Sequence, residues 1–221
     1  MDSLLKEPKK RYLVLGVMAL IVFLVMAGCG IVAYSGIKDI INQNENKQAY
    51  TIEGYDYSLR GNATEYQIGL FNQLSEALKA EEKDDKRIAE LVAMNYVADF
   101  YTWTNKLGPY DIGGMHFVYA DQRLNIYDQA KMYFYHYLNY YQNQFGETNL
   151  LEVMETSLSD ETGVGTVEIG GETYPYYYVH LQWTYKPVEG FDYSFYTTSQ
   201  EIRVTKFNDT RYEITEVYNL Q

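Results

Sequence analysis

The chain of 221 residues has one cysteine and only four prolines, and both scarcities restrict what the protein can be. Cys29 falls within an apolar run, so the rest of the chain has no disulfide and no thiol nucleophile. Exported domains of eukaryotes often carry disulfides, and their absence favours a bacterial origin if the domain is exported. Four scattered prolines also exclude a proline-rich stalk.

Positive charge is scarce as well. The chain has 18 Lys and Arg against 30 Asp and Glu, a net charge of −12, although the first 11 residues contain four cations and two anions. The acidic remainder repels phosphate backbones, so we expect no nucleic-acid partner. Cationic proteins, cationic wall components and metal ions stay open as partners, and so does the simpler interpretation that the charge serves solubility.

Catalytic and cofactor motifs are missing from the sequence. The three histidines, His116, His136 and His180, show no metal-ligand spacing such as HExxH, and there is no GxSxG, P-loop or GxGxxG sequence. The sequence therefore indicates no catalytic residue, no metal site and no cofactor, and it favours binding or assembly over catalysis.

The longest apolar run covers residues 12–34 and contains no charged residue over 23 positions. As a helix it would be roughly 34 Å long, enough to cross a hydrocarbon core of about 30 Å. Lys6, Lys9, Lys10 and Arg11 precede it, which predicts that residues 1–11 are cytoplasmic and that the remainder lies outside. We therefore expect a single-pass protein of the cell membrane with an extracytoplasmic C-terminal domain.

A lipoprotein signal competes with this interpretation. Residues 26–29, Met-Ala-Gly-Cys, resemble a lipobox in which Cys29 would be lipidated. The residues after Cys29 stay apolar through Tyr34, whereas a lipidated N-terminus normally turns polar there. A cleavable secretory signal would have a shorter apolar stretch, of about 7–15 residues. Both the retained helix and the lipoprotein leave the bulk of the chain outside.

Beyond the apolar run, residues 35–61 are predicted to be a juxtamembrane linker and residues 62–221 a single domain. Asn62 with Glu65 resembles a capping box, and the apolar spacing predicts a first helix from there. A second helical pattern runs from Ile88 to Trp103, and a third helix is predicted over residues 121–144. Between the last two helices, residues 115–119 predict a short strand.

The C-terminal part of the chain predicts strands, over residues 149–158, 164–169, 173–186, 193–207 and 211–218. Gly170-Gly171 suits a two-residue hairpin turn. On the long strand, one face collects the side chains of Tyr177, Val179, Leu181, Trp183 and Tyr185. The fold class is therefore predicted to be α+β, with about three helices packed on a curved antiparallel sheet.

The helix sequence AELVAMNYVADFY at residues 89–101, followed later by paired C-terminal strands, resembles the nuclear transport factor 2-like superfamily. The resemblance implies a cone-shaped domain over residues 62–218, in which a bent sheet curls around a helix. A membrane-anchored branch, the inner-membrane assembly subunit of type IV secretion and conjugation systems, has the same plan of tail, spanning helix, linker and cone. Cones of this class include enzymes, ligand binders and scaffolds, so fold likeness does not set the function.

One set of residues predicts a ligand pocket in such a cone. Tyr96 and Asp99 share the inner side of the second helix, and with Trp103, Tyr178 and His180 they could line a cavity. Some cone enzymes place a carboxylate or histidine beside a tyrosine in an apolar pocket. The simpler interpretation is that Asp99 lies at the boundary of the helix, bonded to a Tyr hydroxyl or an Arg.

The 25 tyrosines also predict a contact surface, because tyrosine adds interface area at a low cost in rotamer entropy. Two candidate patches are Tyr174 and Tyr176 on the long strand, and Tyr133, Tyr137 and Tyr140 on the third helix. We expect a membrane-anchored binding or assembly protein whose partners are the membrane, other envelope proteins or a second copy of the chain. A small-ligand binder or enzyme that uses the cone cavity is the alternative.

Overall fold

The computed structural model describes residues 50–219. The predicted cytoplasmic tail, the predicted spanning segment at residues 12–34, Cys29 and most of the predicted linker lie outside the described residues. Among the helices within residues 50–219, none is long and apolar enough to cross a membrane.

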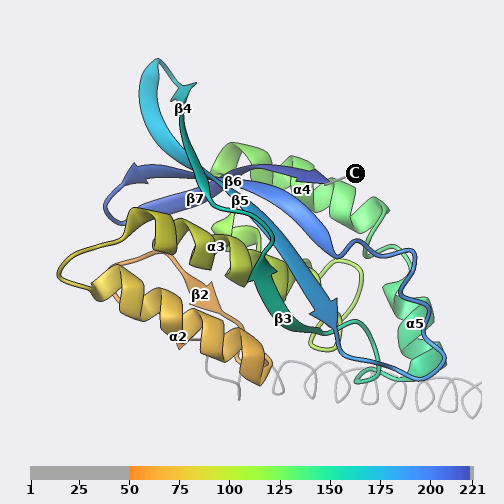
Figure 1. Cartoon of the computed structure of the whole chain (residues 1–221). Helices are drawn as coiled ribbons and strands as arrows, with labels where there is room; N and C mark the ends of the chain where they lie inside the picture. The colour runs from red at the N-terminus through yellow and green to blue at the C-terminus, as the bar shows by residue number, and fades with distance from the viewer. Residues whose placement is uncertain (1–49, 220–221) are drawn as a thin grey trace, which may run out of the picture. The chain divides into compact units, whose positions relative to one another are not determined.

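The described residues form an α+β unit in which helices precede and pack on an antiparallel sheet, as predicted (Figure 1). Its helices are α2 (Glu65–Lys79), α3 (Asp85–Phe100), the 3-10 helix η1 (Met115–Phe117), α4 (Ala120–Met132) and α5 (Leu138–Phe145). Its strands are β1 (Tyr50–Thr51), β2 (Ser58–Leu59), β3 (Val153–Leu158), β4 (Gly163–Ile169), β5 (Glu172–Tyr185), β6 (Ser199–Asn208) and β7 (Arg211–Asn219).

The main sheet has the strand order β3-β5-β6-β7, and every pairing is antiparallel. β3 and β4 follow one another along the same edge of β5, because β3 pairs with its C-terminal half and β4 with its N-terminal half. Gly170 and Gly171 close the β4–β5 hairpin with φ values of 63° and 84°, which confirms the predicted two-residue turn. This hairpin extends beyond the rest of the sheet (Figure 1).

α3 is the central element of the fold. Asp84 caps its first turn by accepting a hydrogen bond from the Arg87 backbone N–H at 3.1 Å. α2 packs along one side and the sheet covers the other, so every residue of α3 after Arg87 is buried. β5 turns toward it the apolar face that the sequence predicted, and burial of each large side chain there contributes about 1.5–3 kcal/mol.

The folded unit begins earlier than predicted. Residues 50–61, which the sequence assigned to the linker, form the antiparallel β1–β2 pair. Ile52, Tyr57 and Leu59 from this segment are buried in the core. Similarly, Thr64 caps α2 in place of Asn62, and its capping-box partner is Gln67 rather than Glu65.

The predicted helix over residues 121–144 is two helices, α4 and α5, separated by an aromatic segment. Phe134 and Tyr135 are adjacent in sequence, and both turn toward Trp103 in the core. The Tyr135 hydroxyl donates to the Phe100 carbonyl at 2.6 Å. A continuous helix could not direct two neighbouring side chains at the same site, so tertiary burial breaks it.

Two predicted strands are also corrected. Residues 115–119 contain η1 instead of a strand, because Gly114 takes a left-handed conformation (φ 74°) and turns the chain into a 3-10 helix. β6 begins at Ser199 rather than at residue 193. The preceding segment forms a turn in which the Ser194 N–H donates to the Asp192 carboxylate and the Tyr196 N–H to the Tyr193 carbonyl.

Candidate functional site

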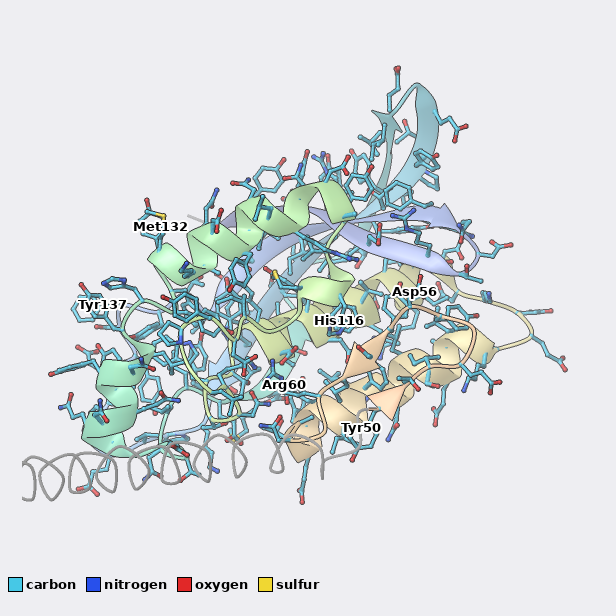
Figure 2. All side chains as sticks on the ribbon, turned by 180° about the vertical axis from the view of Figure 1, so that it is seen from behind. Tyr50, Asp56, Arg60, His116, Met132 and Tyr137 are labelled. Carbon is cyan, nitrogen blue, oxygen red and sulfur yellow. The ribbon has the colours of Figure 1, made fainter. Side chains whose placement is uncertain are left out.

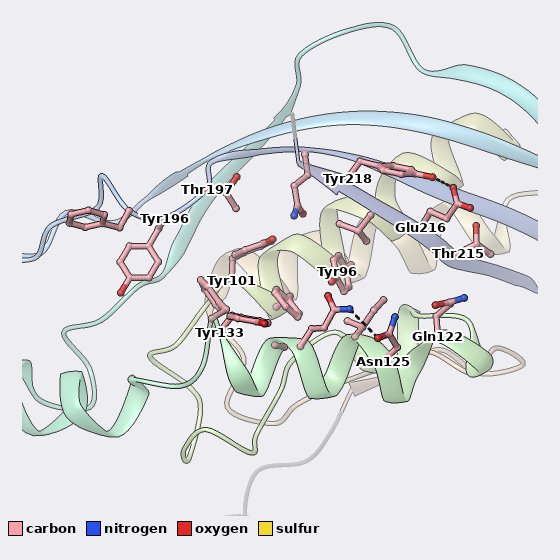
Figure 3. Close-up of a pocket in the computed structure, with 18 of the residues that line it drawn as sticks. Tyr96, Tyr101, Gln122, Asn125, Tyr133, Tyr196, Thr197, Thr215, Glu216 and Tyr218 are labelled. Atoms are coloured by element: carbon pink, nitrogen blue, oxygen red, sulfur yellow. Dashed lines mark hydrogen bonds between the residues drawn. The ribbon is translucent and has the colours of Figure 1, made fainter. Parts of the chain in front are cut away.

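A groove of about 910 Å³ lies between α4 and the β6–β7 edge of the sheet, with the C-terminal part of α3 as its floor (Figure 3). The floor consists of Tyr96, Phe100 and Tyr101. Burial raises the pKa of the Tyr96 and Tyr101 hydroxyls, so both remain neutral hydrogen-bonding groups at physiological pH. The floor is therefore aromatic and uncharged.

α4 forms one wall of the groove through a single side of the helix. Gln122, Asn125, Ile126, Gln129 and Tyr133 recur at spacings of three and four residues and all line the groove. The Gln129 side-chain amide donates to the Asn125 side-chain oxygen at 3.0 Å. Because each amide both donates and accepts, this wall offers a row of neutral hydrogen-bonding groups, named here the amide row (Gln122, Asn125 and Gln129).

β7 forms the opposite wall with Thr215, Glu216, Val217 and Tyr218. Glu216 is the only ionised side chain among the residues that line the groove, all of which lie in the described range. Its carboxylate accepts a hydrogen bond from the Tyr218 hydroxyl and pairs with the Arg203 guanidinium. The groove is therefore lined by a single anionic side chain, Glu216, which is paired with Arg203, and by no cationic side chain.

Large aromatic side chains surround the mouth of the groove. Phe195 is 85% exposed, Tyr133 73% and Tyr137 61%, and all three line the groove. Tyr137 and Met132 both point outward where α4 is followed by α5 (Figure 2). Soluble domains rarely leave such side chains together in water unless they contact a ligand or a partner.

The five residues predicted to form one pocket do not meet in one cavity. Tyr96 lines the groove, whereas Asp99 and Trp103 are fully covered within the core. Tyr178 and His180 lie on the face of β5 that points away from the helices, where Tyr178 contacts Arg203 and His180 lies 3.8 Å from Glu201. Strand alternation correctly predicted that Tyr178 and His180 share one face of β5. The opposite, apolar face is the one that packs on α3, so these two residues cannot share a cavity with Tyr96.

Asp99 belongs to a buried ion cluster. Its carboxylate accepts hydrogen bonds from Lys106 Nζ at 2.9 Å, Arg60 Nε at 3.1 Å and the Gly114 N–H at 2.7 Å. Burial opposes its ionisation, but Lys106 and Arg60 outweigh this and hold the pKa of the carboxyl well below its usual range. The Arg60 guanidinium also donates two hydrogen bonds to the Asp111 carboxylate, in a bidentate contact. The cluster fastens the loop after α3 to the helix, which agrees with the simpler interpretation of Asp99.

The two tyrosine patches differ in how open they are. Tyr133, Tyr137 and Tyr140 are all exposed, and the first two line the groove. Tyr174 is half-buried and packs against Phe207. Tyr176 is buried, with the Arg203 guanidinium 4.5 Å from its ring centre. The helix patch therefore presents the larger open aromatic surface.

Sequence reasoning missed the amide row and Phe195. The spacing of residues 122, 125 and 129 on a predicted helix was the available signal, because it puts three amides on one helical face. Phe195 was assigned to a strand, and its exposure in a turn had no local sequence signal. Within residues 50–219, no group of three His, Cys, Asp or Glu side chains is placed to hold a metal ion.

Comparison with known proteins assigns no family. The chain matches no family model, and no curated protein or solved structure is significantly similar to it. The geometry of the groove is therefore the basis for a functional proposal.

Proposed function

We propose that the chain is a membrane-tethered, extracytoplasmic binding protein that holds a partner protein in the groove between α4 and β7, in an assembly role. The observation that carries this proposal is the groove itself, with its uncharged floor, its amide row and its exposed aromatic rim. Such a lining binds through packing and neutral hydrogen bonds. The acidic balance of residues 50–219, with 26 Asp and Glu against 12 Lys and Arg, favours cationic partners over nucleic acid.

The membrane tether is proposed from the sequence at residues 12–34, with lipidation of Cys29 as the alternative anchor. Tethering would raise the effective concentration of the groove for neighbouring envelope proteins. A reporter active only outside the cytoplasm should be active when fused after Gln221, and Cys29→Ser should leave the protein in the membrane. Activity of a cytoplasm-only reporter would reverse the topology, and loss of attachment on Cys29→Ser would favour the lipoprotein.

The order of helices and strands supports a nuclear transport factor 2-like cone, with the groove as its opening, and we propose this finer assignment. Under it, the membrane-anchored assembly subunits of type IV secretion and conjugation systems are the proteins of similar plan. Other envelope proteins and a second copy of the chain would then be the partners.

A second candidate is a small-ligand binder or an enzyme that uses the same groove. The volume of about 910 Å³ favours it, because small-molecule sites commonly enclose about 300–1,000 Å³. A small molecule retained through purification and released on unfolding, without any protein contact at the rim, would support this candidate instead.

Photo-crosslinking in the membrane tests the main proposal. A photoreactive amino acid replaces Tyr133 or Phe195 at the rim, and Val164 on β4, which is 65% exposed, serves as the matched control. We expect protein-sized adducts from the two rim positions and none from Val164. Equal yields at all three positions, or no adduct at the rim, would contradict a protein-binding groove.

A further inference from the structure

β7 contributes four consecutive residues to the groove, from Thr215 to Tyr218. Side chains of a strand alternate between the two faces of its sheet, so a cavity over one face would touch only every second residue. The groove therefore reaches the outer edge of β7, between this edge and α4 (Figure 3). It also extends under the inner face of β6, where Gln200 lines it.

The first half of that edge is occupied by the chain itself. The Tyr57 hydroxyl donates to the Tyr212 carbonyl at 2.6 Å and accepts from the Tyr212 N–H at 3.1 Å. The Tyr119 N–H donates to the Ile214 carbonyl at 2.9 Å. Beyond Ile214, β7 has no strand partner at this edge among residues 50–219. Because a strand directs alternate backbone groups to each edge, the N–H and C=O groups that face the groove beyond Ile214 have no strand partner within residues 50–219.

The amide row faces this open edge from the other side of the groove. An extended segment lying between the two walls would turn one edge of its backbone toward β7 and the other toward Gln122, Asn125 and Gln129. Both edges would then find hydrogen-bonding partners, which an extended peptide requires when it leaves water.

Length and charge define the segment further. The α4 wall from Gln122 to Tyr133 is roughly 16 Å long at 1.5 Å per residue. An extended chain rises about 3.3 Å per residue, so the wall matches about five residues. The lining holds no cation, and its one carboxylate, Glu216, is paired with Arg203. The surrounding domain is acidic, with 26 Asp and Glu against 12 Lys and Arg in residues 50–219. Charge complementarity therefore favours a segment that carries Lys or Arg.

We propose that the groove binds an extended, basic peptide segment of a partner protein, which adds to the open edge of β7 as a further strand. Aromatic or aliphatic side chains of the segment pack on the exposed rings of Tyr133 and Phe195 at the mouth of the groove. Backbone pairing supplies affinity in this mode, and the pockets for alternate side chains supply specificity. The inference rests on the proposed function, because it names the class of partner for the same groove.

Peptide selection with the full-length protein in detergent micelles tests this inference. The probe is a displayed library of random octapeptides. Enriched peptides should alternate apolar with polar residues, carry net positive charge and lack proline in their central positions. One enriched peptide is then synthesised in two N-methylated forms. One form carries N-methyl groups on the odd-numbered residues and the other on the even-numbered residues, so that each blocks a different edge of the extended peptide. N-methylation facing β7 should weaken binding about tenfold, and N-methylation of the opposite edge should weaken it less, because only one edge pairs with a strand.

Side-chain variants of α4 provide a readout on the other wall. Asn125 and Gln129 are exposed, so Asn125→Ala and Gln129→Ala should leave the fold intact and weaken peptide binding by about threefold each. Leu124→Ala is the matched control, since Leu124 is 71% exposed on the same helix and does not line the groove. It should leave the affinity unchanged.

Strand addition is overturned if no octapeptide is enriched, if the enriched peptides are acidic, or if both N-methylated forms bind alike. Rim adducts at Tyr133 and Phe195 would in that case still support the proposed function, so the two failures are distinguishable. A full-length chain that dimerises, and whose dimer is dissociated by Gln129→Ala, would assign the groove to a second copy and also overturn the inference.

Discussion

Asp99 and Lys106 are a pair of opposite charges removed from water, with 3% and 0% of their side chains exposed. Asp99→Asn leaves the Lys106 ammonium buried beside Arg60 without its counter-charge. Breaking a buried pair by changing one partner costs about 3–5 kcal/mol, so we expect a loss of this size in the free energy of unfolding, measured by urea denaturation at pH 7.

Glu161→Gln is the matched control for Asp99→Asn. Glu161 pairs with Lys86 at 3.2 Å, but 88% of its side chain is exposed. Exposed pairs contribute about 0–1 kcal/mol, so this change should barely alter stability. Equal effects of the two substitutions would show that the Asp99 cluster does not stabilise the fold.

His116 makes the stability of the domain dependent on pH. Burial lowers the pKa of its imidazole from 6.5 to about 4. The negative charge of Asp99 raises this pKa, whereas the positive charges of Arg60, Arg123 and Lys106 lower it. Between these values the unfolded chain binds a proton that the folded chain does not. Stability should therefore fall as the pH falls from 6.5 to 4, by up to about 3 kcal/mol.

The measurement is the free energy of unfolding at pH 7 and at pH 4.5. His116→Gln should flatten the change between the two pH values, because Gln does not titrate. His136→Gln is the control, since His136 is exposed, and it should keep the wild-type slope. An unchanged slope in His116→Gln would mean that His116 is not the group that titrates in this window.

At the scale of elements, two glycines test the packing of α3 and α2. A Cβ on Gly113 would lie 2.3 Å from the Asp99 carbonyl oxygen, which belongs to the backbone of α3 and cannot move aside. Gly69 is exposed within α2, and a Cβ there would meet nothing within 4 Å. Gly113→Ala should lower the free energy of unfolding by about 3 kcal/mol, whereas Gly69→Ala should raise it by about 1 kcal/mol.

Thermal unfolding of the two alanine variants checks these opposite signs. A melting temperature that rises in Gly113→Ala would mean that the loop after α3 is not held against the helix. A lower melting temperature in Gly69→Ala would mean that the helical bounds of α2 are wrong.

The elements that the sequence predicted best are those with strong periodicity. The apolar repeat from Ile88 onward identified α3, and alternation identified the inner face of β5, because both patterns reflect burial directly. The break between α4 and α5 escaped prediction, because it is decided by Phe134 and Tyr135 reaching Trp103, a contact between distant parts of the chain. Local sequence propensity gives no information about such a long-range contact.

The groove was predicted only in part for a related reason. Tyr96 was identified by its place on the inner side of a helix, and Tyr133 and Tyr137 as members of an aromatic patch. The β7 wall required the strand order, since only a strand at the sheet edge can border a groove with consecutive residues. Strand order depends on long-range pairing, which a single sequence does not reveal.

At the scale of the whole molecule, the position at which the folded unit begins is open to test. Residues 50–61 bury Ile52, Tyr57 and Leu59, and they supply Arg60 to Asp99 and Asp111. A chain of residues 49–221 should therefore fold without a membrane, with a circular dichroism spectrum of mixed helix and sheet and a cooperative unfolding transition. An all-helical spectrum would contradict the fold.

A chain of residues 62–221 should be far less stable, because it lacks three buried side chains that contribute about 1.5–3 kcal/mol each. It also leaves Asp99 and Asp111 without Arg60, and the Tyr212 backbone without the Tyr57 hydroxyl. The summed loss approaches the 5–15 kcal/mol by which whole domains are stable, so this chain should be unfolded or only marginally folded at 25 °C. Equal denaturation midpoints for the two chains would instead show that residues 50–61 do not stabilise the folded unit and belong to the linker.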